Sequence, residues 1–342
     1  MPSARDANPL PSIRDVARLA GVSHMTVSRV LNDSPNVSEQ ARARVENAID
    51  ELRFRPSSTA RALAHGRTRT LGVLDATGGL LYGPSRTISA IELAGRDLGY
   101  SVMIAAVDAA DLASVHSALE HLLDQDAAGV IVIGPSAHTH DAVAEAAPRV
   151  PVMTMHGTHE GDGFIGQTLG VQAAVDHLLQ LGHTRIAHIA GPAEWSEAES
   201  RRRGFIASLQ AAGLEPAAIV PSDWSADAGY RAGQQLLRDA DTTAVVCAND
   251  QIALGLLHAA AEAGIPVPGR LSIVGFDDTP ESRHFSPPLT TLRQDFTEIG
   301  RRAVASIVEA LAGGRSAAEH VAEPLVPELI VRASTAKLAP GT

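Results

Sequence analysis

Apolar residues recur at helical spacing in the first part of the chain. Between residues 12 and 54 they form three groups: Ile13, Val16, Ala17 and Ala20; Val27, Val30 and Leu31; and Val45, Ile49 and Leu52. This spacing predicts three short amphipathic helices. Ser12 and Asp15 form a capping-box pattern for the first helix, and Ser23 and Ser38 can cap the second and third.

From Leu71 onward the pattern changes to short apolar runs that alternate with amphipathic helices. Strands are predicted at 71–74, 102–107, 129–133, 152–155, 186–189, 244–248 and 271–275, and helices between them at 86–98, 169–181, 226–238 and 250–263. The alternation continues for about 250 residues, as a doubly wound α/β fold requires. At 342 residues the chain has room for two or three folding units.

Charge separates the two parts of the chain. The net charge is −11, but residues 1–70 carry 11 arginines against 7 acidic residues, which gives +4. The remainder holds 17 basic and 32 acidic residues, which gives −15. Only the N-terminal part therefore suits a polyanion such as DNA.

The N-terminal helices have the form of a helix-turn-helix. Gly21 supplies the turn, and Val27 fixes the second helix. That helix would lie in the major groove with His24, Met25 and Arg29 as base readers, Arg29 pairing with guanine. The residues with short polar side chains suited to phosphate oxygens are Ser12, Ser23, Thr26, Ser28 and Asn32. An ordinary three-helix bundle with solvated faces is the alternative, which the local positive charge disfavours.

A set of ordered motifs resembles the lactose-repressor (LacI/GalR) family of transcriptional regulators. The motifs are Ser12 to Asn32, Val37-Ser38, Arg44-Val45, Leu52, Phe54, Pro56 and Ala60 to Ala64, and the resemblance extends to about Arg332. It implies a small all-α helix-turn-helix headpiece and an α/β two-lobed, periplasmic-binding-protein-like core of doubly wound parallel sheets. It also implies a sequence-specific repressor, not an enzyme, whose operator binding responds to a small molecule.

The resemblance sets the expected domain boundaries. They are a flexible arm at 1–11, the DNA-binding domain at 12–57, a hinge helix and linker at 58–70, the core at 71–333 and a tail at 334–342. Within the core, the N-lobe is expected at about 71–169 and 296–323, and the C-lobe at about 170–295 and 324–333. Ser57, Ala60 and Leu63 are expected to contact DNA, with Leu63 inserted between base steps of the minor groove. Because two hinges must lie side by side, a homodimer is implied. The alternative is that Leu63 packs onto the core.

The same resemblance implies a sugar site in the core. The expected ligand-binding residues are Leu81, Pro84, His156, Trp195, Glu199, Trp224, Asn249, Asp277, Gln294 and Phe296. Several of them follow predicted strands, at the turns where open α/β sheets bind ligands. Carboxylate and amide groups can satisfy several sugar hydroxyls, and an aromatic ring can cover the apolar face of a pyranose.

The site departs from its family pattern at four positions. Glu199, next to three consecutive arginines, stands where a family member that this chain resembles has an arginine that holds sugar hydroxyls. His156 stands at an aspartate position, Ala109 replaces a second arginine, and Trp195 is additional. Each residue also has a structural alternative: Asn249 can cap the following helix, Trp224 can belong to the core, and Asp277-Asp278 can be a solvated turn.

Other functional classes have little support in the sequence. The 14 histidines lack metal-ligand spacing, the single cysteine excludes an intramolecular disulfide, and no paired nucleophile and base stands out. We expect no cofactor and no membrane partner, and a cytoplasmic, nucleoid-associated protein. The favoured function is repression of a sugar-utilisation operon, relieved by a sugar inducer. The alternatives are a repressor that needs a corepressor such as a purine, and a sugar-transport protein or sugar enzyme with an added N-terminal bundle.

Overall fold

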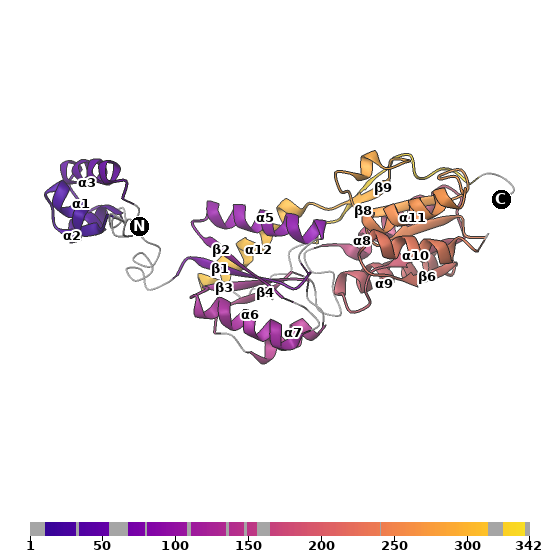
Figure 1. The fold of residues 1–342 in the computed structure, drawn as a ribbon, viewed down its shortest axis with the longest axis horizontal. Helices are drawn as coiled ribbons and strands as arrows, with labels where there is room; N and C mark the ends of the chain where they lie inside the picture. Colours follow the sequence, from indigo (N-terminus) through magenta and orange to yellow (C-terminus); the bar gives the residue numbers. More distant parts are fainter. Residues whose placement is uncertain are drawn as a thin grey trace, which may run out of the picture. The chain divides into compact units, whose positions relative to one another are not determined.

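The computed structural model describes residues 11–31, 34–54, 68–78, 81–107, 111–134, 137–146, 149–155, 165–239, 241–313 and 324–338. The chain divides into two compact units, Met1–Thr68 and Arg69–Thr342 (Figure 1). The predicted arm before Pro11 and the predicted hinge helix lie outside the described residues, and so do Asn32, Ser57, Ala60, Leu63 and His156. In the part of the chain that is described, no helix has the length and apolarity needed to cross a membrane.

The first unit is the headpiece, with helices α1 (Ile13–Ala20), α2 (His24–Leu31) and α3 (Glu39–Leu52). Ser12 and Asp15 form the predicted capping box. Ser23 caps α2 through the Thr26 amide at 3.1 Å, and Ser38 caps α3. The apolar groups identified in the sequence meet in one core around fully buried Val16, Val27 and Val45. The periodicity therefore predicted both the helices and the faces on which they pack.

The N-lobe of the second unit holds a parallel sheet in the order β2-β1-β3-β4. Its strands are β1 (Thr70–Asp75), β2 (Ser101–Ala106), β3 (Gly129–Ile133) and β4 (Val152–Thr154), and its helices are α5 (Tyr82–Asp97), α6 (Leu112–Asp124), α7 (Ala137–Glu145) and α12 (Phe296–Leu311). One apolar cluster joins the sheet to α5 and α12, and a second joins it to α6 and α7. Helices thus cover both faces (Figure 1).

The C-lobe holds a six-stranded sheet in the order β10-β9-β8-β7-β5-β6, parallel except where β10 meets β9. Its strands are β5 (Ile186–Ala190), β6 (Ala218–Pro221), β7 (Ala244–Cys247), β8 (Ser272–Asp277), β9 (Thr290–Arg293) and β10 (Glu328–Ile330). Its helices are α8 (Gln167–Gln180), α9 (Ser196–Ala211), α10 (Ala226–Leu236), α11 (Asp250–Glu262) and the short η1 (Ser282–His284). Clusters on the two faces pack α10 and α11 on one side and α8 and α9 on the other.

A segment expected to be a tail is bonded into the C-lobe. Ser334 is fully buried, and its hydroxyl bonds the carbonyl of Ile273 and the amide of Thr290. The carbonyl of Ala336 lies 3.0 Å from a ring nitrogen of His183. We call residues 334–338 the C-terminal strap, because they extend the C-lobe beyond the boundary expected at residue 333.

Candidate functional site

A pocket lies between the N-lobe and the C-lobe, with about 560 Å³ of empty space when open solvent is included. Its lining residues are Leu81, Tyr82, Gly83, Pro84, Thr87, Ile133, Met155, Ile165, Trp195, Glu197, Arg201, Trp224, Asn249, Gln251, Asp277, Gln294, Phe296 and Ile299. On the C-lobe side they come from strand ends and the helix starts that follow them, which is where parallel sheets place binding groups.

Four polar side chains form a closed circuit on the C-lobe side of the pocket; Gln167, Arg201 and Gln294 are buried, and Asp277 is 11% exposed. Arg201 Nε donates to Gln167 Oε1 at 2.8 Å, and Gln167 Nε2 donates to Gln294 Oε1 at 3.5 Å. Gln294 Nε2 donates to Asp277 Oδ1 at 2.6 Å, and Arg201 Nη2 lies 3.8 Å from the same oxygen. Because each group orients the next, the circuit presents donors and acceptors in fixed directions.

Burial sets the protonation behaviour of this circuit. It raises the pKa of Asp277 to about 6, against the opposing effect of the Arg201 guanidinium and the Gln294 hydrogen bond. Burial also lowers the pKa of Arg201, and Asp277 acts in the opposite direction. The circuit therefore contains a charged pair at neutral pH whose carboxylate half can be protonated in mildly acidic solution.

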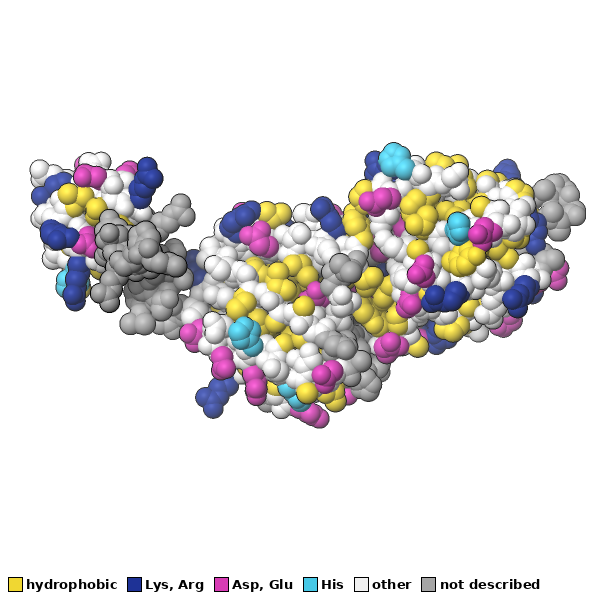
Figure 2. Space-filling model, in the orientation of Figure 1, with side chains coloured by type: hydrophobic (Ala, Val, Ile, Leu, Met, Phe, Trp, Pro, Cys, Tyr) yellow, Lys and Arg dark blue, Asp and Glu magenta, His cyan; other side chains and the backbone are white. Residues whose placement is uncertain are grey.

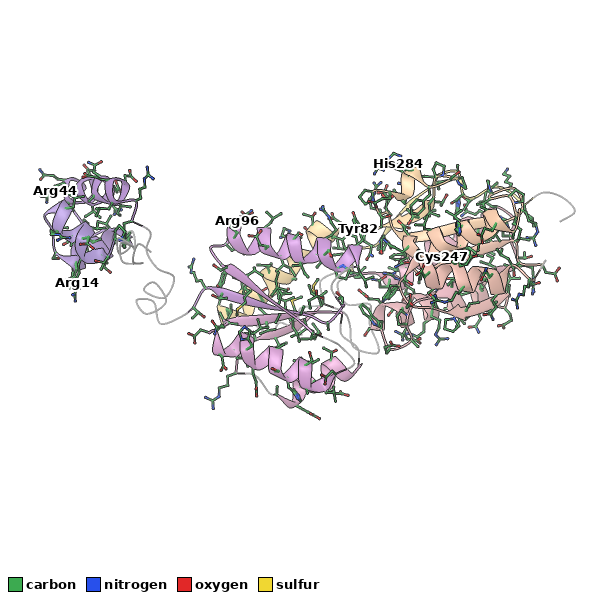
Figure 3. The ribbon with its side chains drawn as sticks, in the orientation of Figure 1. Arg14, Arg44, Tyr82, Arg96, Cys247 and His284 are labelled. Carbon is green, nitrogen blue, oxygen red and sulfur yellow. The ribbon has the colours of Figure 1, made fainter. Side chains whose placement is uncertain are left out.

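Aromatic rings form the walls of the pocket. Trp195 and Trp224 meet edge to face, with centroids 5.5 Å apart and planes at 74°. Tyr82, at the end of α5 next to the C-lobe (Figure 3), meets Phe296 edge to face at 5.7 Å. Gly191 is required beside them, because a Cβ there would come within 2.6 Å of the Trp224 ring.

Eight of the ten predicted ligand-binding residues line this pocket: Leu81, Pro84, Trp195, Trp224, Asn249, Asp277, Gln294 and Phe296. Asn249 also shows the predicted structural alternative, since its Oδ1 caps α11 at the Ile252 amide and its Nδ2 donates to the Trp224 carbonyl. The solvated-turn alternative is wrong for Asp278, whose side chain is only 3% exposed and is ion-paired.

Glu199 is the predicted residue that the structure places elsewhere. Its carboxylate accepts two hydrogen bonds from Arg202, at 2.7 and 2.8 Å, and it is absent from the pocket lining. Arg202 holds the pKa of Glu199 below its ordinary value. The prediction for Glu199 is corrected by the helix geometry: Arg201, two residues later, occupies the pocket instead.

The sequence analysis missed Arg201 and Gln167. Arg201 was visible only as part of the run Arg201-Arg202-Arg203, of which two members face outward and one is buried. Gln167 lay two residues before the helix predicted at 169–181, with no charge or motif to mark it. Gln167 lies at the boundary expected between the N-lobe, which ends at about 169, and the C-lobe, which begins at about 170. This position is the signal that could have identified it.

The described part of the headpiece carries its predicted DNA-binding residues on α2 and just before the starts of α1 and α2. His24, Met25 and Arg29 are exposed on α2, Met25 at 55%. Thr26 and Ser28 are partly exposed, and the hydroxyls of Ser12 and Ser23 take part in helix caps. Basic side chains appear at several positions on the headpiece face drawn in Figure 2, with a few acidic ones between them.

Two family models match the chain. One, described as bacterial regulatory proteins of the lacI family, covers residues 12–57, and the other, described as a periplasmic binding protein-like domain, covers residues 175–335.

Curated relatives match almost the whole chain. The lactose operon repressor of Escherichia coli (strain K12) is 35% identical over 338 residues, 97% of this chain and 92% of that protein. The HTH-type transcriptional repressor PurR of Glaesserella parasuis serovar 5 (strain SH0165) is 33% identical over 96% of this chain and 99% of its own. The ribose operon repressor of Escherichia coli (strain K12) is 34% identical over 86% and 91%.

Solved structures similar to this chain are also those of transcriptional regulators. The lac repressor dimer bound to operator and the anti-inducer ONPF has a TM-score of 0.86 at 32% identity, covering 95% of this chain and 99% of that one. The complex of the transcriptional regulator CelR with cellobiose has a TM-score of 0.69 at 27% identity, with the same coverage. The operons and ligands named for these relatives differ, so similarity by itself leaves the effector open.

Proposed function

The chain belongs to the LacI family of bacterial regulatory proteins, as a DNA-binding repressor with an effector-binding core, and we propose that its effector is a small sugar acting as an inducer. The sugar binds in the pocket between the lobes and lowers the affinity of the headpieces for operator DNA. The regulated genes would then be a sugar-utilisation operon.

The composition of the pocket carries this proposal. A carboxylate, a guanidinium and carboxamides converge on its C-lobe side at Asp277, Arg201 and Gln294, and can satisfy several hydroxyls at once. Trp224 and Phe296 supply apolar surface for a sugar ring. Such a mixture of a few convergent polar groups and aromatic walls is typical of small-molecule sites.

Operator release requires the sugar to prefer one of two states of the protein. In the proposed mechanism two chains grip a pseudo-palindromic operator through His24, Met25 and Arg29 of each α2, with Leu63 of each hinge in the minor groove. A sugar that binds more tightly to the DNA-free arrangement shifts the population toward it by its difference in affinity. The homodimer is part of this proposal.

A thermal-shift screen of mono- and disaccharides tests the effector class. A ligand at 100 times its Kd stabilises the folded state by about 2.7 kcal/mol, which raises the melting temperature measurably. The screen should include free purines. If the screen finds no stabilising sugar, the sugar proposal fails.

Substitution of the pocket carboxylate tests the site. We expect Asp277→Asn to retain operator binding in a gel shift and to lose release by the sugar identified in the screen, since Asn cannot form the ion pair with Arg201. Glu199→Gln is the matched control, because Glu199 lies outside the pocket and should release normally. Normal release by Asp277→Asn would remove Asp277 from the site.

A purine corepressor is the second candidate, favoured by the similarity to PurR over 96% of this chain. In that case the ligand would tighten operator binding. Gel shifts with and without ligand separate the two candidates by the sign of the effect. The edge-to-face arrangement of Trp195 and Trp224 favours the sugar, because it offers no pair of parallel rings between which a flat purine could stack.

A further inference from the structure

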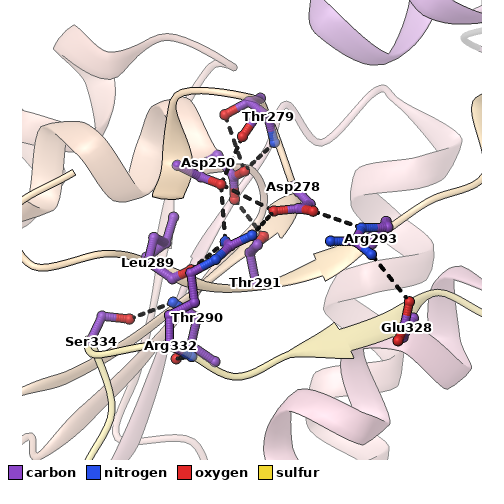
Figure 4. A network of polar contacts seen from close by, with 11 residues as sticks. Asp250, Asp278, Thr279, Leu289, Thr290, Thr291, Arg293, Glu328, Arg332 and Ser334 are labelled. Atoms are coloured by element: carbon purple, nitrogen blue, oxygen red, sulfur yellow. Dashed lines mark hydrogen bonds and ion pairs between the residues drawn. The ribbon is translucent and has the colours of Figure 1, made fainter. Parts of the chain in front are cut away.

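Two pocket residues are next in sequence to members of a second polar network, which is drawn in Figure 4. Asp277 precedes Asp278, and Gln294 follows Arg293. Arg293 Nε donates to Asp278 Oδ2 at 2.7 Å, and β8 and β9 pair in parallel with Asp277 opposite Arg293. One ion pair therefore joins the two segments that present Asp277 and Gln294 to the pocket.

The turn at Asp277 needs to be held in place. Asp277 has a φ of 103° and Asp278 a φ of 49°, a region that residues other than glycine adopt at a cost in free energy and keep only where their surroundings fix them. Asp278 is anchored by Arg293, by the Arg332 guanidinium and by the Ser282 hydroxyl. Its anchored carboxylate therefore fixes the backbone conformation that aims Asp277 into the pocket.

Arg293 also stands where the chain passes between lobes. The residues after it lead through Gln294 and Asp295 into α12 of the N-lobe, and the chain is back in the C-lobe at β10. Arg293 Nη1 lies 3.5 Å from Glu328 Oε2 at the start of β10. Arg293, the last residue of β9, therefore contacts both the turn after β8 and the start of β10.

We propose that Arg293 and Asp278 are positioning residues of the effector pocket. Their ion pair fixes the turn at Asp277 and the side chain of Gln294 at the point where the chain crosses to the N-lobe, so that the pocket keeps its shape. This inference rests on the proposed function only in treating the pocket as the effector site.

A role in pocket geometry differs measurably from a role in stability. The Arg293 side chain is 46% exposed, and Asp278 keeps Arg332 as a charged partner when Arg293 is removed. Loss of Arg293 should therefore change global stability little. It should act on the pocket, because only Arg293 among the described residues ion-pairs with both Asp278 and Glu328.

The chain provides its own reporter of pocket geometry. Its two tryptophans, Trp195 and Trp224, both line the pocket. Quenching of their fluorescence by acrylamide reports how open the pocket is, without any effector.

The experiment compares full-length wild type with Arg293→Gln, Arg293→Lys and Arg301→Gln. Arg301 is the matched control, because it forms an exposed ion pair with Glu298 on α12 and is not among the lining residues. We expect Arg293→Gln to raise the quenching constant at least about twofold, the lower end of the effect of residues that couple sites. Its melting temperature should stay within about 4 °C of wild type. Arg293→Lys, which keeps the charge, should bring the quenching constant most of the way back to the wild-type value. Arg301→Gln should match wild type.

Unchanged quenching in Arg293→Gln would overturn the inference. An equal rise of the quenching constant in Arg301→Gln would overturn it too. So would a fall of the melting temperature in Arg293→Gln that Arg293→Lys shares. Both results indicate a general effect on stability. Because acrylamide is the only probe, a failure of every sugar to bind would refute the sugar effector and leave this result standing.

Discussion

The two sides of the effector pocket are built from different chemistry. The C-lobe side presents Arg201, Asp277 and Gln294 in a buried hydrogen-bonded circuit, whereas the N-lobe side presents mainly apolar groups such as Leu81 and Phe296. Hydrogen-bonding groups discriminate between ligands, because a buried polar group that the ligand leaves without a partner costs binding free energy. Apolar groups mainly exclude water. We therefore expect the C-lobe side to select the effector and the N-lobe side to cover it.

The largest expected effect comes from opening the circuit on the C-lobe side. Arg201→Met keeps much of the side-chain volume but leaves the buried Asp277 without its charged partner. Removal of one partner of a buried pair costs about 3–5 kcal/mol, so denaturant unfolding should show a loss of this size and effector binding should disappear. Arg202→Met on the same helix is the control: its ion pair with Glu199 is on the surface and is worth about 0–1 kcal/mol. Equal losses in the two variants would contradict the assignment of Arg201.

A smaller effect is expected from acidification. The pKa of Asp277 is raised to about 6, and sugar hydroxyls donate to its ionised form, so affinity is full above that pH and is lost as the pH falls through it. Between pH 7 and pH 5 affinity should fall about tenfold by this linkage, as isothermal titration with the screened sugar can measure. Glu199→Gln, which lies outside the pocket, should keep the wild-type dependence on pH. A flat wild-type profile would show that Asp277 does not accept hydrogen bonds from the ligand.

The smallest effect is expected on the N-lobe side. Leu81 is partly buried against the C-lobe cluster, so Leu81→Ala should weaken effector binding by about 1 kcal/mol, or about fivefold. The pH profile of this variant should run parallel to that of wild type, because no titrating group is touched. A change in which sugar binds best, measured over the same screen, would mean that the N-lobe takes part in selection.

The headpiece could be predicted in detail because its signals are local. Each helix start is marked by Ser12, Ser23 or Ser38, and each buried face by apolar residues three or four apart. The long strands of the core were predictable for the same reason. β10, by contrast, has only three residues and is formed by antiparallel pairing with β9, more than thirty residues earlier in the chain. No local sequence pattern therefore predicts it.

The prediction of Glu199 as a pocket residue was wrong because the start of its helix also lacks a local signal. α9 begins after Trp195, which makes no side-chain cap, so no capping residue in the sequence marks where the helix begins. Residues two apart on a helix point in nearly opposite directions, so the two-residue difference between Glu199 and Arg201 exchanges a side chain outside the pocket for one inside it. α8 likewise begins after Gly166 without a side-chain cap, and its first residue, Gln167, was missed. Asn249, Asp277 and Gln294, which were predicted and line the pocket, lie at or just after strand ends, where topology fixes their direction.

Both lobes are completed by segments that come late in the chain. α12, which packs beneath the N-lobe sheet, follows the first five strands of the C-lobe, and the C-terminal strap follows every strand described. During synthesis the N-lobe therefore lacks part of its apolar cover until most of the C-lobe has emerged. The headpiece has no such dependence, since its core is made entirely by residues before position 55. We expect the headpiece to acquire its fold first and the two lobes to become protease-resistant together, as a single late event.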